Sequence, residues 1–131
     1  MTLRVCIVED DQDIQEALRL LFEEIDGIIE EAADGEAALA LLRTKPLPRV
    51  LLLDRVMPRL DGVGVLRALA QAPDLQRRTA VILMTARHEP PDAHLAELLA
   101  TLGVEVITKP FDVEDVLHSV ERAWQRLIDT L

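Results

Sequence analysis

Short runs of aliphatic residues alternate with longer amphipathic stretches along the whole chain. Apolar runs of about four to eight residues, bounded by turn-forming residues, are typical of strands buried on both faces. The clearest run is Val50–Leu53, which leads directly into Asp54. The pattern predicts five strands, at residues 3–8, 28–33, 50–54, 80–84 and 104–107.

The stretches between these runs place apolar residues at helical spacing on one face and charged residues on the other. Pro90 and Pro91 suit the first turn of a helix, where proline removes no needed hydrogen bond. Asp112 can cap the last helix. The five predicted helices run from about Asp11 to Gly27, Asp34 to Pro46, Gly62 to Pro73, Pro90 to Gly103 and Asp112 to Leu127.

Strands that alternate with helices predict one α/β domain over residues 1–131. The expected architecture is a doubly wound, five-stranded parallel sheet with helices on both faces, a flavodoxin-like (βα)5 three-layer sandwich. For the strand order we take 2-1-3-4-5, which is common in this fold and makes strands 1 and 3 neighbours. The carboxyl ends of strands 1, 3, 4 and 5 would then line one crevice.

Composition and charge narrow the range of partners. The chain carries 14 Lys+Arg against 24 Asp+Glu, a formal charge of −10, which argues against direct binding to nucleic acid or an anionic membrane. Half of the residues are hydrophobic, so a folded core is expected. A single cysteine, Cys6, fits a reduced cytoplasmic setting, and no apolar run reaches membrane-spanning length.

Chemically active residues follow four of the predicted strands. Carboxylates that are brought close together raise one another's pKa and favour a hard cation with oxygen ligands, of which Mg²⁺ is the cytosolic example. A lysine and a hydroxyl beside such a cation supply what a phosphoryl group needs, and a carboxylate can act as the nucleophile. The residues concerned are Glu9, Asp10 and Asp11 after strand 1, Asp54 after strand 3, Thr85 after strand 4 and Lys109 after strand 5.

At these positions the chain resembles the response-regulator receiver domains of two-component signalling. The resemblance covers nearly the whole chain, from Leu3 to about Leu127, and its motifs occur in the family's order and spacing. The matching stretches are Val8–Asp11, Ala32–Leu39, Asp54–Gly62, Ile82–Ala86 and Ile107–Phe111.

The resemblance implies a role for each matching residue. Asp54 would be the phosphoacceptor. Thr85, Ala86 and Lys109 would bind the phosphoryl oxygens, and the Lys109-Pro110 peptide bond would be cis. Asp11 is expected to cap the first helix rather than to bind metal. The metal, Mg²⁺ with Mn²⁺ as a substitute, would be held by Glu9, Asp10, Asp54 and the backbone carbonyl of Val56.

Two features depart from the common pattern of the family. Receivers usually carry an aromatic residue three places before the lysine, but Val106 occupies that position and the chain has no tyrosine. Val56 and Arg87 lie two residues beyond Asp54 and Thr85, where such domains tune the attack of water on the phosphoryl group. Because valine cannot orient water by hydrogen bonding, we hypothesise slow autodephosphorylation.

The resemblance also sets expectations for partners. A sensor histidine kinase or histidine phosphotransfer protein would supply the phosphoryl group, and the fourth helix, fifth strand and fifth helix would form the output face. That face would bind an unknown downstream protein or a second copy in a homodimer. Trp124 is expected to cover the sheet, although with Ile128 and Leu131 it could extend an apolar patch. We expect no enzyme acting on a separate substrate and no output domain within this chain.

Three alternatives stay open from the sequence. A phosphorylation-independent pseudo-receiver, acting as a protein interaction module, is supported by Val106. A flavodoxin-like electron carrier is disfavoured, because acidic residues follow the first strand where a phosphate-binding loop would be needed. A haloacid-dehalogenase-type phosphohydrolase would need an aspartate where Val56 stands. The three histidines have no metal-ligand spacing and are predicted to be surface residues: His88, His94 and His118.

Overall fold

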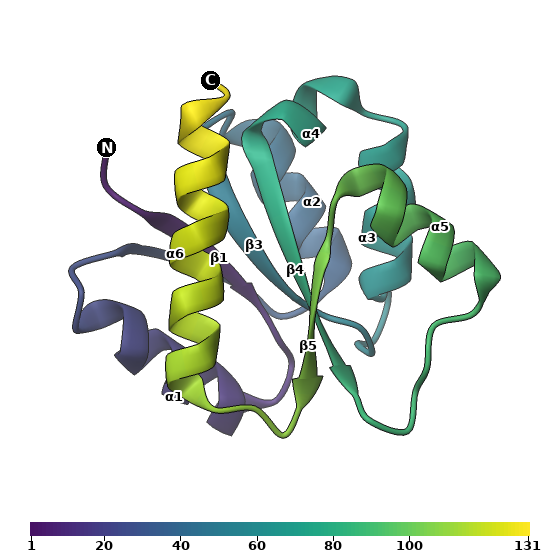
Figure 1. The fold of residues 1–131 in the computed structure, drawn as a ribbon, viewed down its shortest axis with the longest axis horizontal. Helices are drawn as coiled ribbons and strands as arrows, with labels where there is room; N and C mark the ends of the chain where they lie inside the picture. Colours follow the sequence, from purple (N-terminus) through teal and green to yellow (C-terminus); the bar gives the residue numbers. More distant parts are fainter.

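The computed structural model describes residues 1–131 as a five-stranded sheet with helices on both faces (Figure 1). All strand pairs are parallel, in the order β2-β1-β3-β4-β5. The predicted fold class and strand order are therefore confirmed. In chain order the elements are β1 (Arg4–Val8), α1 (Gln12–Glu23), β2 (Ile28–Ala32), α2 (Gly35–Thr44), β3 (Arg49–Asp54), α3 (Gly62–Ala70), α4 (Pro73–Arg78), β4 (Thr79–Ala86), α5 (Ala93–Leu102), β5 (Glu105–Lys109) and α6 (Val113–Asp129).

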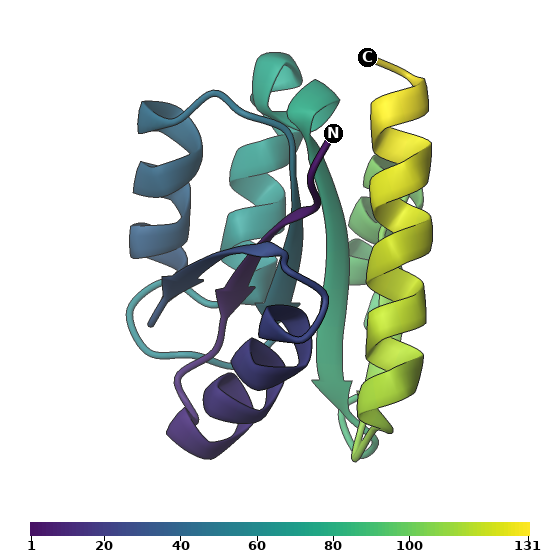
Figure 2. The same ribbon diagram turned by 90° about the vertical axis from the view of Figure 1, so that its left-hand side faces the viewer.

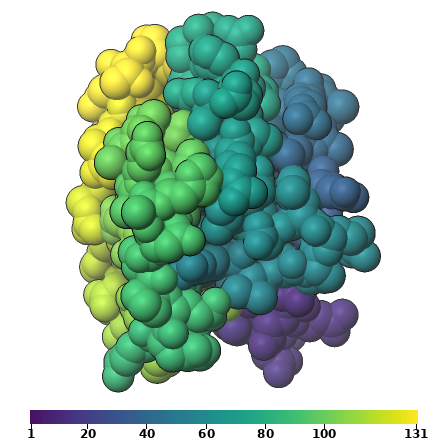
Figure 3. All heavy atoms as spheres, turned by 90° about the vertical axis from the view of Figure 1, so that its right-hand side faces the viewer, coloured from purple at the N-terminus to yellow at the C-terminus, as the bar shows by residue number.

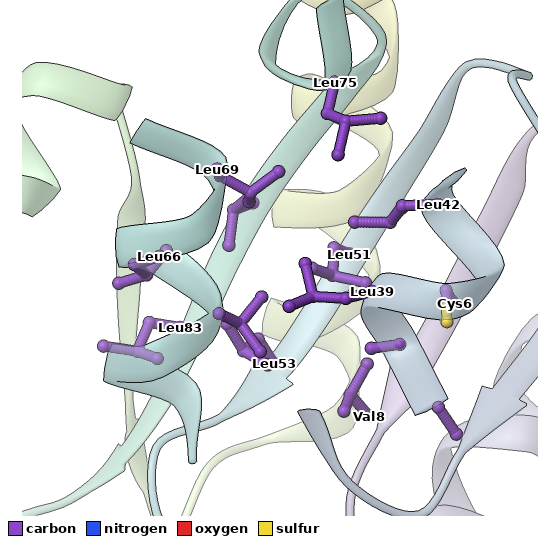
Figure 4. Close-up of a cluster of buried hydrophobic side chains, with 14 of the residues drawn as sticks. Cys6, Val8, Leu39, Leu42, Leu51, Leu53, Leu66, Leu69, Leu75 and Leu83 are labelled. Atoms are coloured by element: carbon purple, nitrogen blue, oxygen red, sulfur yellow. The ribbon is translucent and has the colours of Figure 1, made fainter. Parts of the chain in front are cut away.

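The alternation of side chains along each strand divides the core into two halves, one on each face of the sheet. Leu51 and Leu53 of β3 point to the face that α2, α3 and α5 cover, and Figure 4 shows this half of the core. Val50 and Leu52 point to the opposite face, which α1 and α6 cover. Figure 2 shows α2 and α6 on opposite sides of the sheet. The central strands are therefore buried on both faces, as the aliphatic runs predicted.

Aspartates begin five of the helices. Each has an extended or near-extended backbone and a side chain that accepts a hydrogen bond from a backbone N–H of the first turn, which satisfies a donor that has no partner within the helix. A substantial share of the acidic residues that outnumber the basic ones thus stabilises the starts of helices rather than binding a ligand. These N-cap residues are Asp11, Asp34, Asp61, Asp92 and Asp112.

Two predicted helix boundaries are wrong. Pro73 does not simply end a helix, because it begins the short additional helix α4, whose Leu75 is buried in the core. Pro90 and Pro91 precede α5 rather than form its first turn, since Asp92 caps the helix and Ala93 starts it. In both places a proline is compatible with more than one position near a helix start.

The fourth and fifth strands extend further towards their carboxyl ends than the apolar runs indicated. β4 runs to Ala86 and β5 to Lys109, so Thr85 and Lys109 lie within strands rather than after them. The ladder hydrogen bonds continue through these polar residues because their neighbours in the sheet supply partners. None of the helices is long and apolar enough to cross a membrane.

Candidate functional site

The carboxyl ends of four strands meet at one edge of the sheet. Val8 of β1 pairs with Leu53 of β3, which places Glu9 and Asp54 at the same level. Asp54 pairs in turn with Met84 of β4, and Ala86 of β4 pairs with Lys109 of β5. The arrowheads of β4 and β5 mark this edge at the bottom of Figure 1. The strand order therefore brings together residues that are far apart in the sequence.

Three carboxylates form an acidic cluster at this edge. Glu9, Asp10 and Asp54 each offer an oxygen, and these oxygens all lie within 4.8 Å of one another. Glu9 is 1% exposed and Asp54 7% exposed, whereas Asp10 is exposed. Asp11 does not join the cluster, because its side chain accepts hydrogen bonds from the backbone N–H groups of Asp13 and Ile14 and caps α1.

Lys109 reaches into the acidic cluster from β5. Its ammonium nitrogen Nζ lies 3.1 Å from Glu9 Oε1 and 3.2 Å from Asp54 Oδ1. One cation thus pairs with two buried carboxylates, which offsets part of their mutual repulsion. The peptide bond between Lys109 and Pro110 is cis, as the resemblance implied.

The electrostatic balance of the cluster shifts two pKa values. Burial, together with the nearby Asp54 carboxylate, raises the pKa of Glu9 to about 8, and Lys109 offsets only part of this increase. Burial alone would lower the pKa of Lys109, but its hydrogen bond to Glu9 and the charge of Asp54 outweigh burial and raise it. A carboxylate with a raised pKa lacks sufficient positive charge around it, and a bound cation would supply that charge.

The other predicted site residues lie around the cluster at different depths. Thr85 is buried, and its hydroxyl donates to the Glu89 carbonyl oxygen at 3.5 Å. Ala86 is half-buried beside it, and Arg87 is exposed. The Val56 side chain is 57% exposed, in the loop that follows Asp54, and Val106 is 42% exposed on β5. Their roles in phosphoryl binding, switching and dephosphorylation stay predictions.

A groove of about 570 Å³ opens beside the cluster. Lys109 and Arg87 contribute positive charge to its walls, while Ile14 and Phe111 contribute apolar surface. His88 also lines it and is exposed, as are His94 and His118, which confirms the prediction that the histidines are surface residues. A protein that brings an anionic group to Asp54 would meet this groove.

Sequence reasoning missed the contacts of two arginines in the loop that follows Asp54. Arg55 Nη1 donates to the Glu89 carbonyl oxygen, the same acceptor that Thr85 uses. Arg59 forms an ion pair with Asp34, at the carboxyl side of β2. These partners lie 34 and 25 residues away in the sequence, so no periodic pattern links them. The only available signal was that Asp34 and Arg59 each fall in a turn on the same side of the predicted sheet.

The donor set fits a hard divalent cation. Three carboxylates within 4.8 Å offer only oxygen ligands, and no cysteine or histidine belongs to the cluster. Mg²⁺ and Mn²⁺ prefer such ligands, and Mg²⁺ binds through a few carboxylates while it keeps several waters. The exposed Asp10 leaves one side of the cluster open to solvent.

The sequence matches one known protein family and several known proteins over nearly its whole length. A profile of the response regulator receiver domain family matches residues 5–121. The response regulator MprA of Mycobacterium ulcerans (strain Agy99) is 32% identical over 129 residues, which cover 96% of this chain and 52% of that protein. The MprA protein of Mycobacterium bovis (strain BCG / Pasteur 1173P2) matches equally, at 32%. The chain thus spans about half the length of the curated relatives it matches.

Solved structures share the fold at moderate sequence identity. A CheY-like receiver domain protein from Methanospirillum hungatei JF-1 is 29% identical with a TM-score of 0.83, covering 96% of this chain and 97% of that one. The receiver domain of Francisella response regulator 1452 is 28% identical with a TM-score of 0.80, covering 95% and 98%. This chain belongs to the response regulator receiver domain family of two-component systems.

Proposed function

We propose that this chain accepts a phosphoryl group on Asp54 from a phosphohistidine of a sensor kinase or a phosphotransfer protein. The observation that carries the proposal is the pairing of the buried Asp54 carboxylate with Lys109 at 3.2 Å, inside a cluster of three carboxylates. A buried carboxylate of this kind is held in place, and the positive charge of Lys109 beside it can offset the negative charge of a phosphoryl group. Membership of the receiver family supports the same role.

In the proposed step, an Asp54 carboxylate oxygen attacks phosphorus and a P–O bond forms. The P–N bond to the donor imidazole breaks, and its electron pair stays on the imidazole nitrogen, which then takes a proton from solvent. Lys109 pairs with a phosphoryl oxygen, and the Thr85 hydroxyl and the backbone N–H of Ala86 donate hydrogen bonds to others. The groove lined by Ile14 and Phe111 lies where the donor protein would approach.

Mg²⁺, or Mn²⁺ in its place, would be held by Glu9, Asp10, Asp54 and the Val56 carbonyl. When bound, the cation supplies positive charge to the oxygens of the transferring group. Glu9 needs that charge most, since burial and Asp54 raise its pKa to about 8. The family relationship and the all-oxygen cluster support this assignment.

The output of the domain would pass through the face that α5, β5 and α6 form. This is the predicted output face, renumbered because α4 is an additional helix. Figure 3 views the molecule from the side of α5, with α3 in teal beside it and α6 in yellow at the edge. Val106 lies exposed on β5. A movement of Thr85 on phosphorylation would therefore have to alter this face without the aromatic side chain that receivers usually carry at this position. A downstream protein or a second copy would bind there.

Val56 and Arg87 would set the lifetime of the phosphoryl group. The exposed Val56 side chain offers no hydrogen bond to an attacking water, and the exposed Arg87 can cover the phosphoryl oxygens. We therefore propose that autodephosphorylation is slow. The domain would remove its own phosphoryl group slowly and would not act as an enzyme on a separate substrate. Residues 1–131 would act as a single receiver domain in the cytoplasm.

The phosphorylation-independent alternative is not favoured. Its support is Val106 alone, whereas the buried Asp54, the acidic cluster and the paired lysine support phosphorylation. A module that works without phosphorylation has no need of buried like charges, which cost folding free energy.

Intact-mass measurement after incubation with acetyl phosphate tests the proposal. We expect one phosphoryl adduct that forms with Mg²⁺, does not form in EDTA, and is absent in the Asp54→Asn variant. Asp61→Asn is the matched control, because Asp61 caps α3 in the neighbouring loop and lies outside the acidic cluster. A folded wild-type protein that gains no phosphoryl group in Mg²⁺ would refute the proposal and return the pseudo-receiver to first place.

A further inference from the structure

The loop that carries Val56 holds an unusual backbone conformation. We call residues 55–61, between β3 and α3, the β3–α3 loop. Within it Arg59 has a φ of 64°, a left-handed conformation that residues other than glycine seldom adopt because Cβ meets the backbone. Arginine has no intrinsic preference for this region, so contacts outside the loop must stabilise the conformation.

Asp34 supplies such a contact from the turn between β2 and α2. Its Oδ2 accepts from Arg59 Nε at 2.5 Å, while its Oδ1 accepts from the backbone N–H of Ala37 at 2.9 Å. The Asp34 side chain is only 8% exposed, and the two hydrogen bonds fix both of its oxygens. These bonds, the Ala37 N–H first, lower the pKa of Asp34, so the carboxylate stays charged at neutral pH.

Gly35 brings the same two segments into direct backbone contact. Its N–H donates to the Leu60 carbonyl oxygen at 2.9 Å. A Cβ at position 35 would lie 2.4 Å from that oxygen and 2.7 Å from Val65 Cγ2, so only glycine fits. The start of α2 and the β3–α3 loop are therefore held together by one ion pair and one backbone hydrogen bond.

The strand before Asp34 also neighbours the acidic cluster. The backbone N–H of Glu9 donates to the Ala32 carbonyl oxygen at 3.2 Å, two residues before Asp34. A continuous set of contacts thus runs from Glu9 through the end of β2 to Asp34, and from Asp34 to the loop that contains Val56. The carboxylates of the cluster lie directly after β1 and at the end of β3, and the β3–α3 loop follows Asp54 directly.

We infer that Asp34 and Arg59 are positioning residues for the cation site, because their ion pair fixes the β3–α3 loop and hence the Val56 carbonyl relative to Glu9 and Asp10. The inference rests on the proposed function, since it concerns the cation proposed there. Neither residue forms a hydrogen bond or ion pair with the acidic cluster, so each acts through the loop.

Magnesium affinity of the full chain, measured by calorimetric titration, tests the inference. Asp34→Asn retains an oxygen to cap α2 but loses the charge that pairs with Arg59. We expect its Mg²⁺ dissociation constant to rise about tenfold, the lower end of the effect of outer-shell partners on metal affinity. Arg59→Ala should weaken Mg²⁺ binding at least as much, because it removes the ion pair and still requires a residue with a Cβ to adopt the left-handed conformation. Arg59→Gly should lie between these variants and wild type, because glycine adopts positive φ freely.

Amide hydrogen exchange supplies a second readout that does not depend on activity. Residues 55–61 should exchange faster in Asp34→Asn and Arg59→Ala, while the central strands should not change. Arg77→Ala is the matched control, since it removes another ion pair on the surface, between Arg77 and Asp74, which lies away from the crevice.

The outcomes separate the inference from the proposed function. If the wild-type protein fails to bind Mg²⁺, the proposed cation site is wrong and the inference falls with it. If wild type binds Mg²⁺ and both Asp34→Asn and Arg59→Ala bind it equally well, the inference alone is overturned. A lower melting temperature with unchanged Mg²⁺ affinity and unchanged exchange in the loop would also overturn it, because the pair would then be merely structural.

Discussion

Glu9 carries the highest electrostatic cost in the acidic cluster. It is 1% exposed, adjoins Asp54, and shares a single lysine with it. Burial of a charged group without enough opposite charge lowers folding stability. The shift of its pKa from 4.5 to about 8 expresses this cost, because the folded protein holds the proton more tightly than the unfolded chain does.

The stability of the metal-free protein should therefore depend on Glu9 as the pH changes. Between the ordinary pKa of 4.5 and the raised pKa of about 8, the folded state binds more protons, so stability falls as the pH rises. Glu9→Gln removes this contribution. Its stability relative to wild type should increase from pH 5 to pH 8, by at most about 1.4 kcal/mol for each pH unit.

Urea unfolding in EDTA at several pH values measures this difference. Glu16→Gln serves as the control, because Glu16 is exposed on α1 and the change also removes one negative charge. A constant difference between Glu9→Gln and wild type across this range would show that Glu9 is not protonated in the folded protein at higher pH.

Backbone geometry and capping hydrogen bonds determine where α5 begins and ends. Asp92 caps its start through the Leu95 N–H, and Gly103 ends it with a φ of 64°. The Gly103 N–H donates to the Ala100 carbonyl and the Val104 N–H to the Leu99 carbonyl, the paired bonds of a Schellman motif. This turn sets where β5, with Lys109 at its end, begins.

Substitution of Gly103 should destabilise the fold through the backbone alone. A Cβ at this position would meet nothing within 4 Å, so no side-chain clash contributes. Gly103→Ala should cost about 1 kcal/mol of unfolding free energy, and Gly103→Asn should cost less, because asparagine tolerates the left-handed region better. Chemical denaturation of both variants measures this order, and equal stability of Gly103→Ala and wild type would contradict the explanation.

Elements with a strong hydrophobic period could be predicted from the sequence. The runs around Val50–Leu53 and the amphipathic stripe of α6 identified their elements, because burial on both faces or on one face leaves a clear pattern. The short helix α4 could not be predicted, since six residues with one buried leucine give no period. Likewise Arg49 is only 1% exposed because it pairs with Glu30, a contact from β3 to the edge strand β2 that hydrophobicity does not reveal.

The part of the candidate site that lies at strand ends could be predicted from the sequence. Glu9, Asp54 and Lys109 each follow or end an apolar run, so the expected strand order was enough to place them together. The ion pair between Asp34 and Arg59 was not predictable, because it depends on how two turns meet in space. The positive φ of Arg59 has no sequence signal either, since arginine is not a turn-forming residue.

At the scale of the whole molecule, the acidic cluster would link folding to the proposed binding of a cation. Two of its carboxylates, Glu9 and Asp10, directly follow β1, and the third, Asp54, ends β3, so the cluster exists only in the folded chain. A ligand that binds only the folded state raises stability in proportion to the logarithm of its concentration. Cation binding at the cluster and folding of the sheet would therefore stabilise each other.

Magnesium should stabilise the protein against unfolding. At a concentration one hundred times the dissociation constant, the gain should reach about 2.7 kcal/mol. Asp10→Asn should reduce this gain, because it removes a carboxylate from the cluster while it leaves the buried pair of Glu9 and Lys109 intact. Thermal unfolding with increasing Mg²⁺ measures the effect, and an equal gain in Asp10→Asn would exclude Asp10 as a ligand.

The contact between Glu9 and Lys109 spans 100 positions of the chain. During synthesis on the ribosome, Asp54 leaves the exit tunnel well before Lys109 does, so a growing chain contains Asp54 without the lysine that pairs with it. A product that is interrupted or cut before β5 retains Asp54 but lacks Lys109 beside it. If Asp54 accepts a phosphoryl group as proposed, a fragment that ends before β5 has no Lys109 to pair with that group. We therefore expect phosphoryl acceptance to require a chain that has been translated through β5.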